Sequence, residues 1–199
     1  NHTNYDQALA YQQEALRYSI LLNDSLASLA DQMGLCKIYI AMKRFNEAEA
    51  ILDAIPHVEK LPIVFQSHIY SLWGFLYEHQ GKDEKAIFYN KKMLEPRFVH
   101  NRNDFAVFYS ISCNYQNLNM HDSALYYGEK ALAAIRDSSI FNFEIYRQTA
   151  QMAARQQQYR QAARYFEEAL RLSLRYTNER SKQSLVEIEK RYDVLRLKQ

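Results

Sequence analysis

Small and apolar residues recur along the chain with helical spacing and with a long-range period of 38 residues. Five segments of similar sequence begin at Tyr5, Phe45, Asp83, His121 and Tyr159. Each carries a shared small residue, which is Ala8, Ala48, Ala86, Ala124 or Ala162, at intervals of 40, 38, 38 and 38 residues. Seven positions further on stand Ala15, Ile55, Met93, Ala131 and Ala169. Residues seven apart lie on one helix face, so each segment is expected to form a helix with a narrow strip for close packing.

A second pattern precedes four of these segments. A large residue is followed by a small one and, three positions later, by tyrosine in LCKIY (Leu35–Tyr39), WGFLY (Trp73–Tyr77) and ISCNY (Ile111–Tyr115). The fourth copy, TAQMA (Thr149–Ala153), keeps only the small residue. This spacing predicts amphipathic helices rather than strands. The chain is therefore expected to alternate an upstream helix A with a downstream helix B, beginning with a lone helix B.

Composition agrees with an all-helical chain and excludes several other classes of protein. Four Gly and three Pro in 199 residues are too few for the tight turns of a β-sandwich or barrel. A hydrophobic content of 48% excludes disorder. The net charge of +2 is too balanced for direct binding of nucleic acid. The longest charge-free stretches, 61–77 and 105–121, are interrupted by polar residues, so no membrane span is predicted.

The two patterns together resemble the tetratricopeptide (TPR) motif, in which a large-small-aromatic helix A is followed by a turn and an Ala-based helix B. The third repeat, residues 71–94, matches best and has Gly81 at the turn, where other repeats have Lys43, Asn119 or Gln157. The resemblance covers roughly residues 5–170 and implies an all-α, right-handed TPR superhelix of about 4.5 repeats, with about ten helices. The surplus over the usual period of about 34 is expected where helix B leads to the next helix A.

The C-terminal segment departs from the repeat. After Leu170 the pattern stops, and a 3-4-3 apolar seam typical of a two-stranded coiled coil follows, formed by Leu185, Ile188, Tyr192 and Leu195. We therefore expect a TPR solenoid over residues 1–176 and a separate helix over residues 177–199. Two interpretations stay open: a helix that caps the last repeat, or an output helix that dimerises through this seam.

A short TPR-like array followed by an EIEKRYD-type helix is similar to the sensor region of membrane-anchored regulators of Bacteroidetes-type bacteria. In those regulators a membrane helix leads to a histidine kinase or helix-turn-helix output. The resemblance implies signal transduction or transcriptional regulation, and it favours the periplasmic side of a membrane over the cytoplasm. Because the chain begins with Asn1 and with a lone helix B, we expect it to be a fragment of a longer protein.

The sequence carries no recognisable motif for catalysis or metal binding. A glycine-rich phosphate loop, a nucleophile elbow and an HExxH motif are all missing. The six His are scattered, and Cys36 and Cys113 lie 77 positions apart, unlike any metal-ligand spacing. We therefore expect a protein that is not an enzyme, with no metal and no cofactor.

Binding is the function that the resemblance implies, in a concave groove lined by helix A side chains that do not pack on their own helix B. The candidate groove residues are Lys37, His68, Ser71, Phe75, Glu78, Tyr109, Cys113, Gln116, Glu144, Arg147, Gln151 and Arg155. Their mixture of aromatic, polar and charged side chains suits a protein or peptide segment. Met33, Ser71 and Tyr109 occupy key places of the carboxylate clamp of chaperone-binding TPR domains, which disfavours a chaperone adaptor.

Two other functions stay open at this stage. One is a structural scaffold that forms a homodimer through its C-terminal helix. The other is a fragment of a glycan-binding outer-membrane lipoprotein, which is disfavoured because no long insertion separates the repeats. An enzyme would need several His, Asp or Glu side chains gathered in one cleft.

Overall fold

The computed structural model describes the backbone of residues 2–98, 104–135 and 142–196, and the side chains within residues 4–98, 104–135 and 142–178. Over these residues the chain is helical and contains no strand, in agreement with the predicted all-α fold. It divides into two compact units, residues 1–120 and 121–199, each of which is described by itself. The division falls between helix A and helix B of the fourth predicted repeat.

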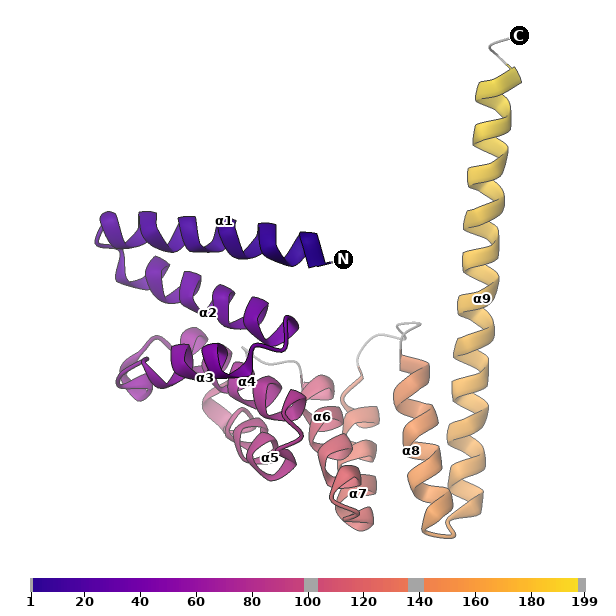
Figure 1. The fold of residues 1–199 in the computed structure, drawn as a ribbon. Helices are drawn as coiled ribbons and strands as arrows, with labels where there is room; N and C mark the ends of the chain where they lie inside the picture. The colour runs from indigo at the N-terminus through magenta and orange to yellow at the C-terminus, as the bar shows by residue number, and fades with distance from the viewer. Residues whose placement is uncertain (1, 99–103, 136–141, 197–199) are drawn as a thin grey trace. The chain divides into compact units, whose positions relative to one another are not determined.

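The helices follow the predicted order (Figure 1). The first unit contains α1 (His2–Leu21), α2 (Ser25–Ala41), α3 (Phe45–Asp53), η1 (Val58–Lys60), α4 (Ile63–His79), α5 (Asp83–Lys92), η2 (Pro96–Phe98) and α6 (Asp104–Asn117). The second unit contains α7 (His121–Ala133), α8 (Phe143–Arg155) and α9 (Tyr159–Arg196). Helices α3, α5, α7 and α9 begin at the residues where the repeat pattern places helix B, so the repeat register is confirmed.

Each unit is a stack of helices that pack on their neighbours in the chain. In the first unit α1 packs on α2, α2 on α3, α4 on α5 and α5 on α6, and α2 also contacts α4. In the second unit α7 packs on α8, and α8 on α9. Figure 1 shows α1 and α2, and likewise α8 and α9, running antiparallel. Contacts between near neighbours are the packing expected of a solenoid of helical hairpins.

The small residues of the repeat are at the helix contacts, as predicted. Ala48, Ala86 and Ala124 have no exposed surface, and Ala162 is 3% exposed. In the second repeat the Cys36 thiol lies 3.7 Å from the backbone oxygen of Ala48, and burial raises the pKa of this thiol to about 12. The corresponding residue of the first repeat, Ala8, is only half-buried.

Aromatic side chains fill the space beside the small residues in the third repeat. Trp73 stacks on Tyr77 and on Tyr89, with ring centroids 5.2 and 5.3 Å apart. Tyr70, one turn before Trp73, meets the fully buried ring of Phe98 edge-on at 5.8 Å. The core of the first unit therefore combines the helix A aromatics with a ring from the connection between two repeats.

Each A-to-B turn has the same backbone geometry. Lys43, Gly81, Asn119 and Gln157 all have positive φ, between 57° and 68°. In each turn the next residue donates its N–H to the carbonyl five residues back, as in Arg44 to Tyr39 and Lys82 to Tyr77, both at 2.8 Å. This is the Schellman motif, which ends a helix with one left-handed residue. The four turns are therefore equivalent, although only one has the glycine that this conformation favours.

The residues by which the repeat exceeds the usual length lie in the B-to-A connections, as predicted, and form the 3₁₀ helices η1 and η2. Gln66 of α4, which is 6% exposed, forms hydrogen bonds with both of these connections. Its amide nitrogen donates to the carbonyl oxygens of Glu59 and Leu61, at 3.2 and 2.8 Å. Its amide oxygen accepts a hydrogen bond from Arg97 at 3.0 Å.

The last helix differs from the expected arrangement. The sequence predicts about ten helices, whereas the described residues contain nine α-helices, because helix B of the fifth repeat continues into the C-terminal segment as α9. No helix end occurs at residues 176–177, and Figure 1 shows α9 running back along α8 and extending far past its start. The side chains of Leu185, Ile188, Tyr192 and Leu195 lie outside the described residues, so the dimer seam stays a prediction.

Candidate functional site

A groove of about 320 Å³ lies between α4, α5 and α6 in the first unit. It is lined by Ser67, His68, Ser71, Phe75, Glu78, Asn90, Met93, Ala106, Val107 and Ser110. Four of the twelve predicted groove residues are brought together here, namely His68, Ser71, Phe75 and Glu78. The lining combines an aromatic ring, aliphatic side chains, hydroxyls, an imidazole, an amide and one carboxylate.

Helix α4 presents these four residues because their spacing keeps them on one face. His68, Ser71, Phe75 and Glu78 follow one another at intervals of three, four and three positions, which is the helical repeat. The opposite face is buried and includes Ile69, Leu72 and Leu76. Phe75 is 43% exposed, so core packing, which is the usual role of a phenylalanine in a helix A, is excluded for this ring. The ring packs instead against His79 in a tilted arrangement, with ring centroids 4.1 Å apart.

Glu78 is the centre of a hydrogen-bond network that joins the three helices. Its Oε1 accepts from the Asn90 amide of α5 at 3.1 Å and from the Asn114 amide of α6 at 3.0 Å. The Ser110 hydroxyl of α6 also donates to Oε1. Asn90 contacts the Ser110 hydroxyl at 2.7 Å as well, which closes the network. Three neutral donors thus hold one carboxylate in a fixed position across the groove.

The pKa of Glu78 is raised above the usual value for a glutamate. Burial is the main cause, because it removes water from the charged form. The amides of Asn114 and Asn90 and the nearby His79 act in the opposite direction, and Asp83 adds to the rise. Burial outweighs these contacts, so the ionised carboxylate is held at an energetic cost.

Sequence reasoning missed Asn90 of helix B, and it missed Ser110 and Asn114 on the face of α6 that meets α4. Asn90 occupies the buried strip of helix B between Ala86 and Met93, whereas the TPR resemblance assigns the groove to helix A. A polar amide on a strip of buried residues is the signal that could have found it. Ser110 and Asn114 lie four positions apart on α6, next to the predicted Tyr109 and Cys113.

The other predicted residues of the first unit lie outside this groove. Lys37 is exposed on α2, and Tyr109, Cys113 and Gln116 are half-buried on α6. The neighbouring positions of α6, Ser110 and Asn114, make the contacts with Glu78. The predicted face of α6 is therefore one position away from the face that meets α4. Neither Cys36 nor Cys113 forms a disulfide.

In the second unit the predicted residues are all on α8. Arg147 donates to Glu144 at 2.8 Å, and Gln148 donates to the same carboxylate at 3.0 Å. The hydrogen bond from Arg147 lowers the pKa of Glu144. The two charges therefore satisfy each other within one helix. Gln151 is half-buried and Arg155 exposed.

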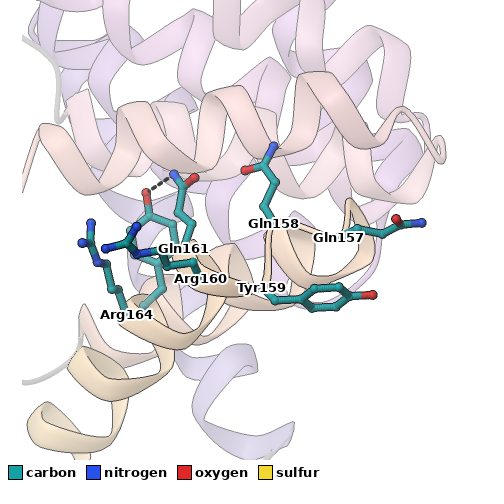
Figure 2. Close-up of a pocket in the computed structure, with 7 residues that line it drawn as sticks. Gln157, Gln158, Tyr159, Arg160, Gln161 and Arg164 are labelled. Carbon is teal, nitrogen blue, oxygen red and sulfur yellow. Dashed lines mark hydrogen bonds between the residues drawn. The ribbon is translucent and has the colours of Figure 1, made fainter.

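Figure 2 shows a more open hollow in the second unit, of about 610 Å³, at the turn from α8 to α9. It is lined by Gln157, Gln158, Tyr159, Arg160, Gln161, Arg164 and Tyr165. Gln161 donates to the Tyr165 hydroxyl at 2.9 Å, and Tyr159 is 68% exposed. Gln161 and the Tyr165 hydroxyl also donate to the Glu129 carboxylate of α7, so their polar groups are used in the contact between helices.

Two kinds of site are missing from the described part of the chain. No three His, Cys, Asp or Glu side chains are placed to hold a metal ion there. None of the helices described is long and apolar enough to cross a membrane.

Comparisons with known proteins match this arrangement of helices. No protein family and no curated protein matches the sequence. Among solved structures, BtubC (BKLC) from P. vanneervenii superposes with a TM-score of 0.71 at 16% identity, over 86% of this chain and 74% of that one. MamA gives a TM-score of 0.65 at 17% identity, over 89% and 93% of the two chains. A putative kinesin light chain of Podosopora anserina, with nearly identical TPR-like repeats, gives 0.69 at 15% identity, over 88% and 90%.

The chain has a TPR-like fold. The sequence identities are too low to carry function, so they support the architecture alone. In TPR terms, α2–α3 and α4–α5 are complete repeats of the first unit, and α1 is a helix B without a preceding helix A in the chain. The groove is formed by one complete TPR repeat, α4–α5, and helix A of the next repeat.

Proposed function

We propose that the chain is a non-enzymatic module that binds a segment of protein or peptide in the groove between α4, α5 and α6. The observation that carries this proposal is Phe75, a ring 43% exposed beside a carboxylate that three helices hold in place. An exposed aromatic ring next to fixed polar groups is the usual composition of an anchor point for a peptide. The TPR-like neighbours agree with an interaction module.

A random dodecapeptide phage library panned on the immobilised chain tests this function. We expect a consensus sequence to emerge, and the synthetic consensus peptide to bind Phe75→Ala at least about tenfold more weakly than the unchanged chain. Loss of a buried aromatic contact is worth about 1.5–3 kcal/mol, and 1.4 kcal/mol corresponds to a factor of ten. The measurement is fluorescence anisotropy of the labelled peptide.

Phe88→Ala is the matched control for this substitution. Phe88 is 55% exposed on α5 and does not line the groove. Its removal should leave the affinity within about twofold of the unchanged chain. The function is wrong if panning yields no consensus, or if the consensus peptide binds Phe75→Ala and Phe88→Ala equally well.

The finer role that we propose is the sensory or interaction region of a bacterial signalling or transcriptional regulator. The continuity of α9 supports this role, because one helix leads from the last repeat contact with α8 to Arg196. A ligand that favours one arrangement of the repeats would change the packing at the start of α9, and a rigid helix would pass that change on. The competing proposal is a scaffold that dimerises through the seam of Leu185, Ile188, Tyr192 and Leu195.

Hydrogen exchange with the consensus peptide separates these two roles. For the sensory role we expect slower amide exchange in residues 159–196 when the peptide is bound than when it is absent. For a scaffold, exchange should be the same in both states, and truncation after residue 178 should convert a dimer to a monomer in light scattering. Equal exchange with and without the peptide therefore rejects the relay through α9.

A further inference from the structure

The groove between α4, α5 and α6 contains one formally charged side chain at neutral pH, Glu78, among ten that line it. The rest of the lining is His68, three serines, one amide and four apolar side chains, so the groove has a local negative charge. The whole chain has a net charge of +2. The charge of the groove is therefore opposite in sign to the net charge of the chain. A positively charged ligand would be attracted by the local charge of Glu78 and not by the net charge of the protein.

The Glu78 carboxylate is satisfied on one oxygen only. The hydrogen bonds from Asn90, Ser110 and Asn114 all end on Oε1. Within the described residues, no hydrogen bond ends on Oε2 and no Lys or Arg forms an ion pair with Glu78. A half-buried carboxylate without a cation is costly, since its burial is compensated only by neutral donors. The second oxygen is the acceptor that an incoming positive group would use.

An apolar wall stands beside this carboxylate. Phe75 is one turn before Glu78 on α4, and the same groove is lined by Met93, which directly follows α5, and by Val107 of α6. A ring face attracts a cation within about 6 Å, and aliphatic side chains cover the methylene stem of Lys or Arg while its charged end reaches an acceptor. Acceptor and wall together match a long basic side chain better than a short or acidic one.

We propose that the groove recognises an arginine or lysine of a linear peptide segment, with the cation on Glu78 and its stem along Phe75. This inference rests on the proposed function and adds the chemistry of the ligand. Asn90 and Asn114 act as positioning residues, because they hold Oε1 and thereby aim the carboxylate. The bond to the cation is a charge-assisted hydrogen bond, which is about twice as strong as a neutral one.

Peptide pools of defined composition test the inference. Fluorescein-labelled nonapeptide pools, random except for a central Arg, Lys, Gln or Glu, are titrated with the whole chain at 150 mM salt. We expect the Arg and Lys pools to bind tenfold or more tighter than the Gln and Glu pools. In Glu78→Gln this preference should fall to within twofold, because the amide keeps the Oε1 acceptor for Asn90 and Asn114 but carries no charge.

Glu49→Gln is the matched control. Glu49 is also half-buried and accepts from the Tyr77 hydroxyl at 3.2 Å and from Gln80 at 3.4 Å, but it does not line the groove. Its substitution should leave the preference for basic pools unchanged. Urea unfolding of both variants establishes that they are folded.

Each remaining outcome overturns the inference, and the outcomes differ in what they say of the proposed function. If Gln or Glu pools bind as tightly as basic pools and Phe75→Ala weakens all of them, the groove binds peptides without reading a basic residue. If the preference for basic pools survives in Glu78→Gln, a group other than Glu78 recognises the basic residue, and the inference is wrong. If no pool binds saturably, peptide binding itself is wrong.

Discussion

Truncating Phe98 to alanine is expected to lower the free energy of unfolding of the first unit by about 3–5 kcal/mol. Phe98 is the largest side chain with no exposed surface in the described residues. Its ring meets Tyr70 edge-on at 5.8 Å, and the Arg97 guanidinium carbon lies 4.5 Å from the ring centroid. Removing the ring opens a cavity where a connection between repeats packs on α4, and the surrounding helices can close it only in part.

The measurement is urea unfolding followed by tryptophan fluorescence. The chain has one tryptophan, Trp73, which is buried in the first unit, so the signal reports that unit. Phe88→Ala serves as the control, because Phe88 is 55% exposed and its loss should cost less than about 1 kcal/mol. Equal unfolding midpoints for Phe98→Ala and Phe88→Ala would show that η2 is not part of the core.

The repeat pattern predicts the helices of this fold, but it does not predict the packing of Phe98. The starts of α3, α5, α7 and α9 followed from the repeat, because a helix face and a small contact residue are local features. The connections carry the residues that exceed the usual repeat length. Because their sequences do not recur from repeat to repeat, no pattern indicates how they pack. The repeat therefore predicted where the surplus lies but not that Phe98 would enter the core.

In the candidate site, too, the residues of one helix face could be predicted, whereas contacts between helices could not. His68, Ser71, Phe75 and Glu78 could be predicted as a set, because they share one face of one helix. Asn90 could not, since its role depends on the contact of α5 with α4 and α6, which is a property of three helices. The repeat pattern also does not predict the continuity of α9, because the repeat stops after Leu170 although no Gly or Pro follows to end the helix.

Gly74→Ala is expected to destabilise the first unit by about 1–3 kcal/mol, although alanine is the better helix former by about 1 kcal/mol. A Cβ at position 74 would lie 2.5 Å from Asn90 Oδ1 and 3.1 Å from its Cγ. The Asn90 amide is 6% exposed and is held by Glu78 and Ser110, so it cannot turn aside without breaking these bonds. The new methyl group therefore displaces the residue that positions the candidate site.

A second glycine substitution, Gly81→Ala, separates the clash with Asn90 from the general effect of replacing a glycine. Gly81→Ala places alanine at φ +68°, with no atom within 4 Å of the new Cβ. It should cost about 1–2 kcal/mol from backbone strain alone, without changing peptide affinity.

In an Asn90→Ala background the clash with the new Cβ at position 74 is absent, so adding Gly74→Ala should then be neutral or stabilising. Urea unfolding of the four members of this cycle measures the coupling between the two sites. If Gly74→Ala costs as much in the Asn90→Ala background as in the unchanged chain, contact with Asn90 is not the reason for the glycine.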